Sequence, residues 1–398
     1  MNNKKKAVNK FIQLEGFILD RLDQISITEL MIEVIEAKKL LYRVLTCPKD
    51  MQALISMPLV PYLSLICDGL DSFLGPSGSS SKEFEDILGV PFTKLIRNSR
   101  SSVKLLSDKK KLVKINKISN NISDQNNELL RLGYGEIQLD FIDLFGQADL
   151  GVFSYLGTPY ANTFQISIYF TDILFHNIDY IKSKEEMDNH IKNAMIHFSS
   201  SLARYISSAS QPFEEKWGIQ FEKDEVNSDL NIDYFSATDY FYSDENRRNV
   251  FTDRMDKEIQ LHLFNSLCQL NYIGNVLVRL LGSSNALFVR IKLIAYLSAV
   301  MSLENLYSSN IVLDELLEKR VNEIIKNKER LFEKESSLRN NIFHYKIVGL
   351  DESMFDNTDN ILATIIEAKS NYTIDNFISK IDCEIDIITQ LISELIGY

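Results

Sequence analysis

Apolar residues recur at steps of three and four over most of this chain, and few residues interrupt the pattern. This is the period of an amphipathic helix. Only 15 Gly and 7 Pro occur among 398 residues, which is few for an all-β protein with many tight turns. We therefore predict a mainly α-helical fold. The pattern is clearest after Thr373, where one apolar face is marked by Ile374, Phe377, Ile378, Ile381, Ile385, Ile388, Leu391, Ile392 and Leu395.

The C-terminal region, residues 251–398, is expected to form an up-and-down helical bundle. Gly282 and Gly349 each follow a periodic segment, as C-terminal stop signals do. Short connections between long amphipathic helices favour antiparallel packing. The predicted helices cover residues 255–281, 285–307, 313–334, 336–348 and the segment from 373 onward.

Two more regions precede this bundle. Residues 1–130 are predicted to be largely helical, with periodic segments at 7–46 and 50–74 and a Gly/Ser-rich loop at 75–81. Residues 131–250 are expected to be mixed or irregular. Alternating apolar and polar residues there predict strands at 137–141 and 164–170, with turns at Gly151 and 157–159. A helix is expected at 182–210 and an irregular connection at 213–250.

The charge pattern limits the nucleic-acid surfaces that this protein can offer. Its net charge is −12, which argues against an extended DNA-coating role. Residues 97–117 form the one strongly basic stretch. We predict RNA-backbone contacts there, while a solvated helix or loop remains the simpler reading. The residues concerned are Arg97, Arg100, Lys104, Lys109, Lys110 and Lys111.

No targeting, cofactor or metal signal was found. Cys47, Cys67, Cys268 and Cys383 form no C-x-x-C pair and have no His at ligand spacing, so we expect reduced, mostly buried thiols of a cytoplasmic protein. Neither a secretory signal nor a membrane-spanning run is expected. The loop at 75–81 lacks a phosphate-binding Gly-Lys-Ser/Thr. We therefore predict no cofactor, no metal and no membrane association.

The segment Ser337–Tyr345 stands out from the other predicted helices. At 100° per residue, Leu338, Ile342 and Tyr345 form a stripe that suits the bundle interior. A second face mixes Arg339, Asn340 and His344 with the apolar residues Phe343 and Ile347. A helix that is apolar on both sides is usually covered on both sides. We predict that Phe343 and Ile347 contact another domain or a second copy of the chain.

The polar residues of this second face suit metal-free RNA cleavage. A histidine side chain ordinarily titrates near neutrality, so an imidazole at position 344 can give or take a proton. The guanidinium of Arg339 matches phosphate oxygens, and Asn340, one turn before His344, can orient the imidazole or bind phosphate. One chain supplies a single histidine here. A two-fold axis along this face would bring a second His344 and so provide both an acid and a base.

The segment Arg339-Asn340-x3-His344 resembles the R-x4–6-H motif of nucleases in the HEPN superfamily, in which a polar residue often follows the Arg. The predicted bundle over roughly 250–398 also resembles that family's fold. The resemblance implies a metal-independent endoribonuclease that acts as a dimer and leaves a 2′,3′-cyclic phosphate. It also implies a toxin or anti-phage abortive-infection effector that cuts cellular RNA such as tRNA, with a phage-derived trigger or regulatory protein as partner. Arg97-Asn98 and Arg248-Asn249 have no His at this spacing.

Two alternatives remain open at this point. An inactive bundle of the same type would bind RNA or a partner protein as a scaffold or antitoxin. A helical interaction protein unrelated to RNA would bury the second face of helix 336–348 under its own N-terminal region. His190, His197 and His262 are interpreted as surface or packing residues, because no metal-ligand spacing joins them.

Overall fold

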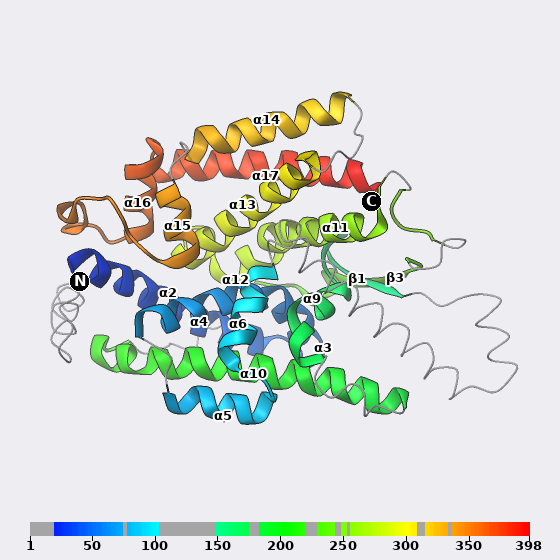
Figure 1. Ribbon diagram of the computed structural model, residues 1–398, viewed down its shortest axis with the longest axis horizontal. Coiled ribbons are helices and arrows are strands. Elements are labelled where there is room, and N and C mark those ends of the chain that lie inside the picture. The colour runs from blue at the N-terminus through cyan, green and yellow to red at the C-terminus, as the bar shows by residue number, and fades with distance from the viewer. Residues whose placement is uncertain are drawn as a thin grey trace, which may run out of the picture.

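The computed structural model describes residues 20–74, 78–102, 149–174, 183–219, 229–242, 248–252, 255–308, 315–332 and 336–398. Over these ranges the chain is mainly helical with one small antiparallel sheet, which confirms the predicted fold class (Figure 1). The α-helices are α2 (Arg21–Thr46), α3 (Lys49–Ser56), α4 (Val60–Leu74), α5 (Gly78–Leu88), α6 (Phe92–Ser101), α9 (Phe164–Leu174), α10 (Lys184–Trp217), α11 (Lys257–Tyr272), α12 (Val278–Leu281), α13 (Ala286–Ser308), α14 (Glu315–Phe332), α15 (Ser336–His344), α16 (Ile361–Ser370) and α17 (Ile374–Ile396). Shorter elements are the 3₁₀-helices η1 (Met57–Leu59), η5 (Ile232–Tyr234) and η7 (Glu352–Phe355), the π-helical segment η6 (Ile273–Leu277), and the strands β1 (Leu150–Tyr155), β2 (Thr158–Asn162) and β3 (Phe235–Tyr240).

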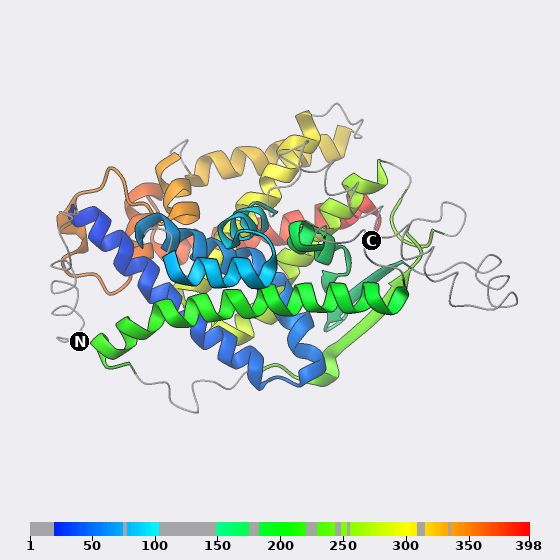
Figure 2. The same cartoon turned by 60° about the horizontal axis from the view of Figure 1, so that its bottom comes forward.

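The helices are stacked in layers across the molecule. In Figure 1, α14 and α17 lie along the top, α13 and α11 beneath them, then α2 and α4, with α10 and α5 at the bottom. Figure 2 shows α10 running along nearly the whole length of the molecule with α5 beside it. Helix α2 packs against α10 and α4 and also against α13, so the first helices of the chain contact the C-terminal ones directly.

Most of the predicted C-terminal helices are confirmed. The 255–281 prediction corresponds to α11, η6 and α12, which run on continuously, and Gly282 ends them with φ 81°. Asn285 starts α13 as a cap, because its Oδ1 accepts a hydrogen bond from the Phe288 amide at 3.2 Å. Helices α14 and α17 also lie where the periodicity placed them. The apolar face of α17 is buried against α11, α13 and α14.

The prediction of a strand at 164–170 was wrong, because this segment is helix α9. Most of its described side chains are buried, and a short run that is buried on nearly all sides does not distinguish a helix from a strand by period. The sheet lies before and after it instead. Strands β1 and β2 form a hairpin through Leu156 and Gly157, both with positive φ, and β3 pairs with the other edge of β1. The strand predicted at 137–141 lies outside the described residues.

Three other boundaries differ from the prediction. Residues 235–240, expected to be irregular, form β3, whose mostly exposed residues lack an alternating pattern. Helix α5 begins at Gly78, within the segment expected to be a loop. Helix α15 ends at His344, four residues earlier than predicted, because Tyr345 adopts a left-handed backbone with φ 55°.

The two most apolar stretches are core helices. Met51–Phe73 and Ala286–Tyr307 are long and apolar enough to cross a membrane by composition alone, but 83% and 89% of their most apolar windows are buried inside the protein. The core helices of soluble proteins show the same burial. Cys47, Cys67 and Cys268 are buried free thiols, as expected, and Cys383 is an exposed one.

Candidate functional site

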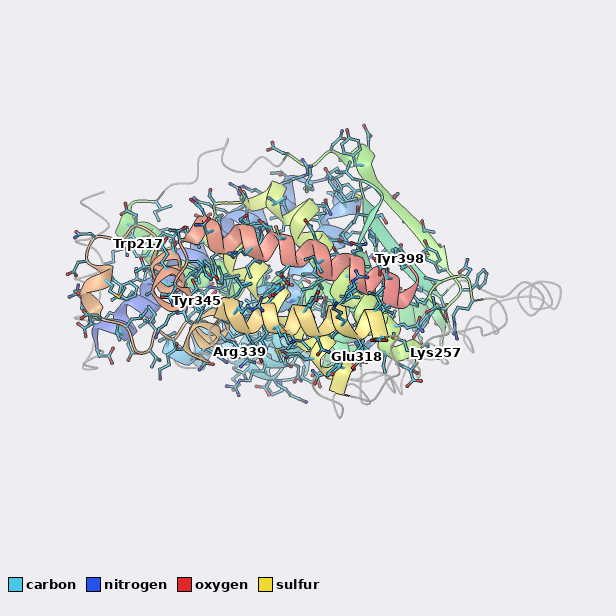
Figure 3. All side chains as sticks on the ribbon, turned by 90° about the horizontal axis from the view of Figure 1, so that it is seen from above. Trp217, Lys257, Glu318, Arg339, Tyr345 and Tyr398 are labelled. Atoms are coloured by element: carbon cyan, nitrogen blue, oxygen red, sulfur yellow. The ribbon has the colours of Figure 1, made fainter. Side chains whose placement is uncertain are left out.

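Helix α15 lies beside α13 and α16, and α4 approaches it from the N-terminal half of the chain. In the view from above, Arg339 marks its position near one end of α14 (Figure 3). Leu338, Ile342 and Tyr345 are fully buried, which confirms the predicted interior stripe. Asn340 and His344 are exposed one turn apart.

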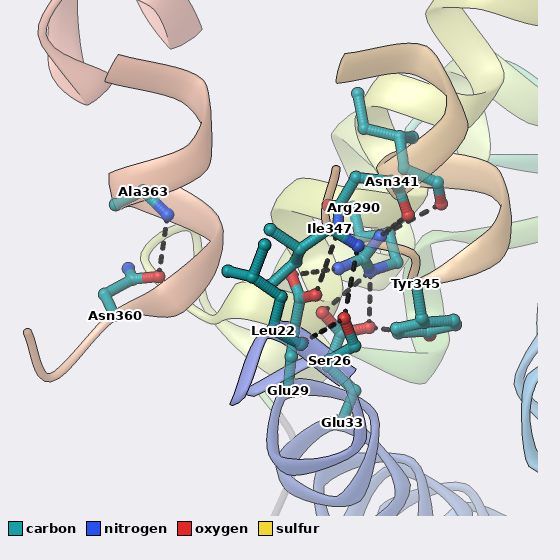
Figure 4. A network of polar contacts seen from close by, with 11 residues as sticks. Leu22, Ser26, Glu29, Glu33, Arg290, Asn341, Tyr345, Ile347, Asn360 and Ala363 are labelled. Carbon is teal, nitrogen blue, oxygen red and sulfur yellow. Dashed lines mark hydrogen bonds and ion pairs between the residues drawn. The ribbon is translucent and has the colours of Figure 1, made fainter. Parts of the chain in front are cut away.

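The buried side of α15 is held by an arginine from α13. Arg290 is 0% exposed, and its Nε donates to both carboxylate oxygens of Glu33 at 2.8 Å (Figure 4). A second nitrogen pairs with Glu29. Its Nη1 donates to the main-chain carbonyls of Asn341 and Ile342 at 2.9 and 3.0 Å. Those carbonyls belong to the last turn of α15, so a buried cation satisfies the end of this helix.

Two side chains of the motif segment complete this network. The Tyr345 hydroxyl donates to Glu33 at 2.8 Å, and the Asn341 side-chain amide donates to Glu29 at 3.2 Å. The Arg290 guanidinium carbon lies 4.1 Å from the centre of the Tyr345 ring. The ring packs on Gly69 of α4, where an added Cβ would lie only 3.0 Å from it. We call Glu29, Glu33, Arg290, Asn341 and Tyr345 the anchor network.

The charges of the anchor network depend on one another. Burial raises the pKa of Glu29 to about 7, Arg290 opposes this rise, and the nearby Glu33 adds to it. Burial acts to lower the pKa of Arg290, but Glu33 and Glu29 outweigh it and hold that pKa above its usual range. Burial also raises the pKa of Tyr345, so its hydroxyl stays a donor. The network therefore joins α2, α13 and α15 through a permanent cation.

The exposed side of α15 meets the start of the basic stretch. Arg100 of α6 places Nη2 3.1 Å from Nδ1 and 3.5 Å from Nε2 of His344. Its Nη1 is paired with Asp68 of α4. Arg97, one turn earlier, has its Nε 3.5 Å from the same carboxylate. The structure thus places one predicted RNA-contacting arginine, Arg100, against the predicted catalytic histidine, and a second, Arg97, on the carboxylate that Arg100 also binds. Lys104, Lys109, Lys110 and Lys111 lie outside the described residues.

Arg339 has its contacts on a different side from those of His344. Its guanidinium lies 5.5 Å from the ring centre of Phe343, and Nη2 is 3.9 Å from the sulfur of Met301 in α13. Arg339 is half-buried, whereas Asn340 and His344 are exposed. Asn340 and His344 therefore share one surface, and Arg339 lies towards α13.

The burial of Phe343 and Ile347 rules out one of the two expected covers, a second copy of the chain. They are only 3% and 4% exposed within a single chain, so these side chains are not available to a second copy. The N-terminal helices supply part of this cover, because the Ile347 amide donates to Ser26 Oγ of α2 at 3.1 Å. The apolar part of the second face is covered internally, while its polar part remains accessible.

The anchor network was not predicted from the sequence, although the sequence contains a signal for it. Arg290 interrupts one of the most apolar stretches of the chain. A charge that a core helix buries needs partners of opposite sign. Glu29 and Glu33 are four residues apart and so share one face of α2.

The other histidines that the structure describes do not form a second centre. His262 is buried, burial lowers its pKa to about 3, and its ring packs against Phe164 at 5.1 Å, which fits the packing interpretation. In the part of the chain that the structure describes, no group of His, Cys, Asp and Glu is arranged to hold a metal ion.

Comparison with known proteins adds no further constraint on the site. No family model, curated protein or solved structure matches this chain.

Proposed function

We propose that this protein is a metal-independent endoribonuclease of the HEPN type, with Arg339, Asn340 and His344 as its catalytic residues. One observation carries the proposal. Asn340 and His344 are exposed one turn apart on a helix whose opposite face is fixed by the buried anchor network. Catalysis requires side chains that are both accessible and rigidly placed, and this helix offers both.

RNA cleavage by attack of the 2′-hydroxyl requires a proton acceptor, a proton donor and a cation. A base removes the proton from the ribose 2′-hydroxyl, and the oxygen attacks phosphorus. The new O2′–P bond forms as the P–O5′ bond breaks, and an acid protonates the departing 5′-oxygen. An imidazole can perform either proton transfer, and a guanidinium can bind the phosphate oxygens. The products are a 2′,3′-cyclic phosphate and a 5′-hydroxyl.

A homodimer supplies the second proton-transfer group in this proposal. One chain brings one His344, and a two-fold axis would place the partner's copy opposite it. Because Phe343 and Ile347 are buried, the contact would use the exposed residues around them. Lys346 is exposed, and Val348, an apolar residue, is 49% exposed. A dimer or a higher even oligomer with composite sites satisfies this requirement.

The biological role that fits such an enzyme is a cytoplasmic toxin or anti-phage effector that cuts cellular RNA such as tRNA. In this role, the region before the bundle senses a trigger, restrains the nuclease or selects the RNA. The trigger would be a phage-derived or regulatory protein.

The deciding experiment incubates purified wild-type protein and His344→Ala with total RNA in the presence of EDTA. We expect wild type to cleave and His344→Ala to lose about 10²–10⁴-fold in rate. His197→Ala is the matched control, because His197 is an exposed histidine on α10. Mapping of the cut ends should find 2′,3′-cyclic phosphates. Equal cleavage by His344→Ala would remove the proposal, and RNA binding without cleavage by wild type would favour an inactive binding module.

A further inference from the structure

Arg100 connects the N-terminal half of the chain to the exposed end of α15. One end nitrogen of its guanidinium is paired with Asp68, and the other lies 3.1 Å from Nδ1 of His344. Three helices that are distant in sequence, α4, α6 and α15, therefore meet at this one guanidinium. Helix α6 packs closely on α4, which fixes Arg100 relative to Asp68.

The guanidinium is oriented before any ligand arrives. The side chain of Arg100 is only 19% exposed and that of Asp68 only 12%, whereas the side chain of Arg97 is 69% exposed. A guanidinium can donate two hydrogen bonds to one anion, and a guanidinium that is already ordered loses less conformational entropy on binding than a mobile one does. The next carboxyl along α4, Asp71, accepts a hydrogen bond from the Tyr205 hydroxyl at 2.5 Å. Asp68 is therefore the carboxylate of α4 that orients Arg100.

The short distance between the Arg100 guanidinium and the His344 ring indicates which ligand Arg100 can share with that ring. A phosphate oxygen that binds the His344 imidazole on the side facing Arg100 would also lie within reach of the guanidinium nitrogen, which is 3.1 Å from that ring. A planar guanidinium is well matched to phosphate oxygens. We propose that Arg100 is a phosphate-binding residue of the RNA site around His344, and that Asp68 is the positioning residue that orients it.

This inference rests on the proposed ribonuclease function and specifies its substrate contact. The ligand is the phosphodiester backbone of single-stranded RNA next to the scissile bond. Phosphate contacts fix the register of a nucleic acid without reading its bases. Arg100 therefore contributes affinity and alignment, and base selection must come from other residues.

Binding can be separated from cleavage on a His344→Ala background. The probe is a short fluorescein-labelled single-stranded RNA, and its Kd is measured by anisotropy over a range of salt concentrations. We expect Arg100→Ala to raise the Kd about tenfold and to reduce the salt slope by about 0.7, the value for one lost phosphate contact on a single strand. In an otherwise wild-type chain, Arg100→Ala should raise KM more than it lowers kcat.

Two more variants test the division of roles. Arg100→Lys keeps the charge and loses the planar fork, so the salt slope should be retained while the affinity falls in part. Asp68→Asn should weaken binding about threefold with the salt slope unchanged, because the cation remains but is less well oriented. Arg320→Ala is the matched control: its side chain is 24% exposed and is paired with Glu394, on α14 and α17. It should leave both the Kd and the slope unchanged.

The outcomes distinguish this inference from the proposed function. If Arg100→Ala binds RNA with the affinity and salt slope of its parent while wild type still cleaves, Arg100 is not a substrate contact and the ribonuclease proposal stands. If wild type neither binds nor cleaves RNA, both proposals fall. Melting curves establish that each variant is folded. Should Arg100→Ala fail that check, Arg100→Gln and Arg100→Lys decide by the same two measurements.

Discussion

The buried face of α15 contacts charged side chains that are almost fully buried, whereas its exposed face carries polar side chains that solvent can reach. Arg290 is 0% exposed, and Glu29 and Glu33 are 3% and 1% exposed, yet every one of them has ionic partners. On the other face His344 is exposed and contacts Arg100, whose own carboxylate partner is Asp68. The same short helix thus contacts a buried ionic network on one face and carries solvent-exposed polar side chains on the other.

This contrast explains why the two faces should respond differently to substitution. A buried ion pair is costly to break, because the remaining charge keeps its desolvation cost without its partner. An exposed side chain leaves the fold almost unchanged when it is truncated. Substitutions in the anchor network should therefore lower the activity because they destabilise the fold. Substitutions at the exposed face should lower the activity without changing the stability.

The largest effect is expected for Arg290→Met. This change leaves Glu29 and Glu33 buried beside each other and removes the donors to the last carbonyls of α15. The free energy of unfolding should fall by about 3–5 kcal/mol, as measured by urea denaturation. A loss below about 1 kcal/mol would show that the network is not dehydrated in solution.

The matched test replaces all three charges at once, as Glu29→Leu, Glu33→Leu and Arg290→Met together. Since apolar replacement of a whole buried ionic cluster is often neutral or stabilising, most of the lost stability should return. Cleavage should remain impaired, because the hydrogen bonds that hold the Tyr345 hydroxyl and the Asn341 side chain are then lost. Recovery of both properties would mean that the network serves stability alone.

A pH effect on stability follows from Glu29. Burial raises its pKa from the ordinary 4.5 to about 7 in the folded protein, so the folded state holds a proton that the unfolded state releases. The stability due to this proton is present below pH 4.5 and is lost as the pH rises through 7. The free energy of unfolding should fall by about 2–3 kcal/mol between pH 5 and pH 8. Glu29→Gln should flatten that part of the profile, and an unchanged profile would contradict the assignment.

Tyr345→Phe should have a smaller effect. The ring that packs on Gly69 is kept, while the hydroxyl that donates to the buried Glu33 carboxylate is lost. Loss of a hydrogen bond to a charged group should lower the free energy of unfolding by about 1.5–3 kcal/mol. Tyr398→Phe is a useful comparison, because Tyr398 is a partly exposed tyrosine at the C-terminal end of the chain. Equal losses for the two would remove the special role of the Glu33 contact.

The sequence predicted the helices better than the site. Periodicity and stop signals placed α13 and α17 well, because their signals are local. The motif helix was also predicted, with the interior stripe of Leu338, Ile342 and Tyr345. Its early end at His344 was not, because the left-handed backbone of Tyr345 goes with a ring that fits against Gly69, more than 200 residues away in the chain.

The site itself depends on partners that periodicity does not reveal. The faces of α2 and α13 that carry Glu29, Glu33 and Arg290 could be drawn from the sequence, but not which helix each face would meet. Arg100 and His344 are 244 residues apart in the chain, and the packing of α4, α6 and α15 brings them together. Phe343 and Ile347 were correctly expected to be covered, but the cover is the chain's own core.

The smallest effect on stability is expected for Asn340→Ala, which also tests the contrast between the two faces most directly. Asn340 is exposed within α15, and alanine has the higher helix propensity, so the free energy of unfolding should change by less than about 0.5 kcal/mol. If Asn340 orients the imidazole or binds phosphate, cleavage should still fall about tenfold, equivalent to about 1.4 kcal/mol of transition-state stabilisation. Asn193→Ala, at an exposed position of α10, is the control and should change neither quantity. A large loss of stability in Asn340→Ala would mean that the exposed face also holds the fold together, and the separation between the two faces of α15 would fail.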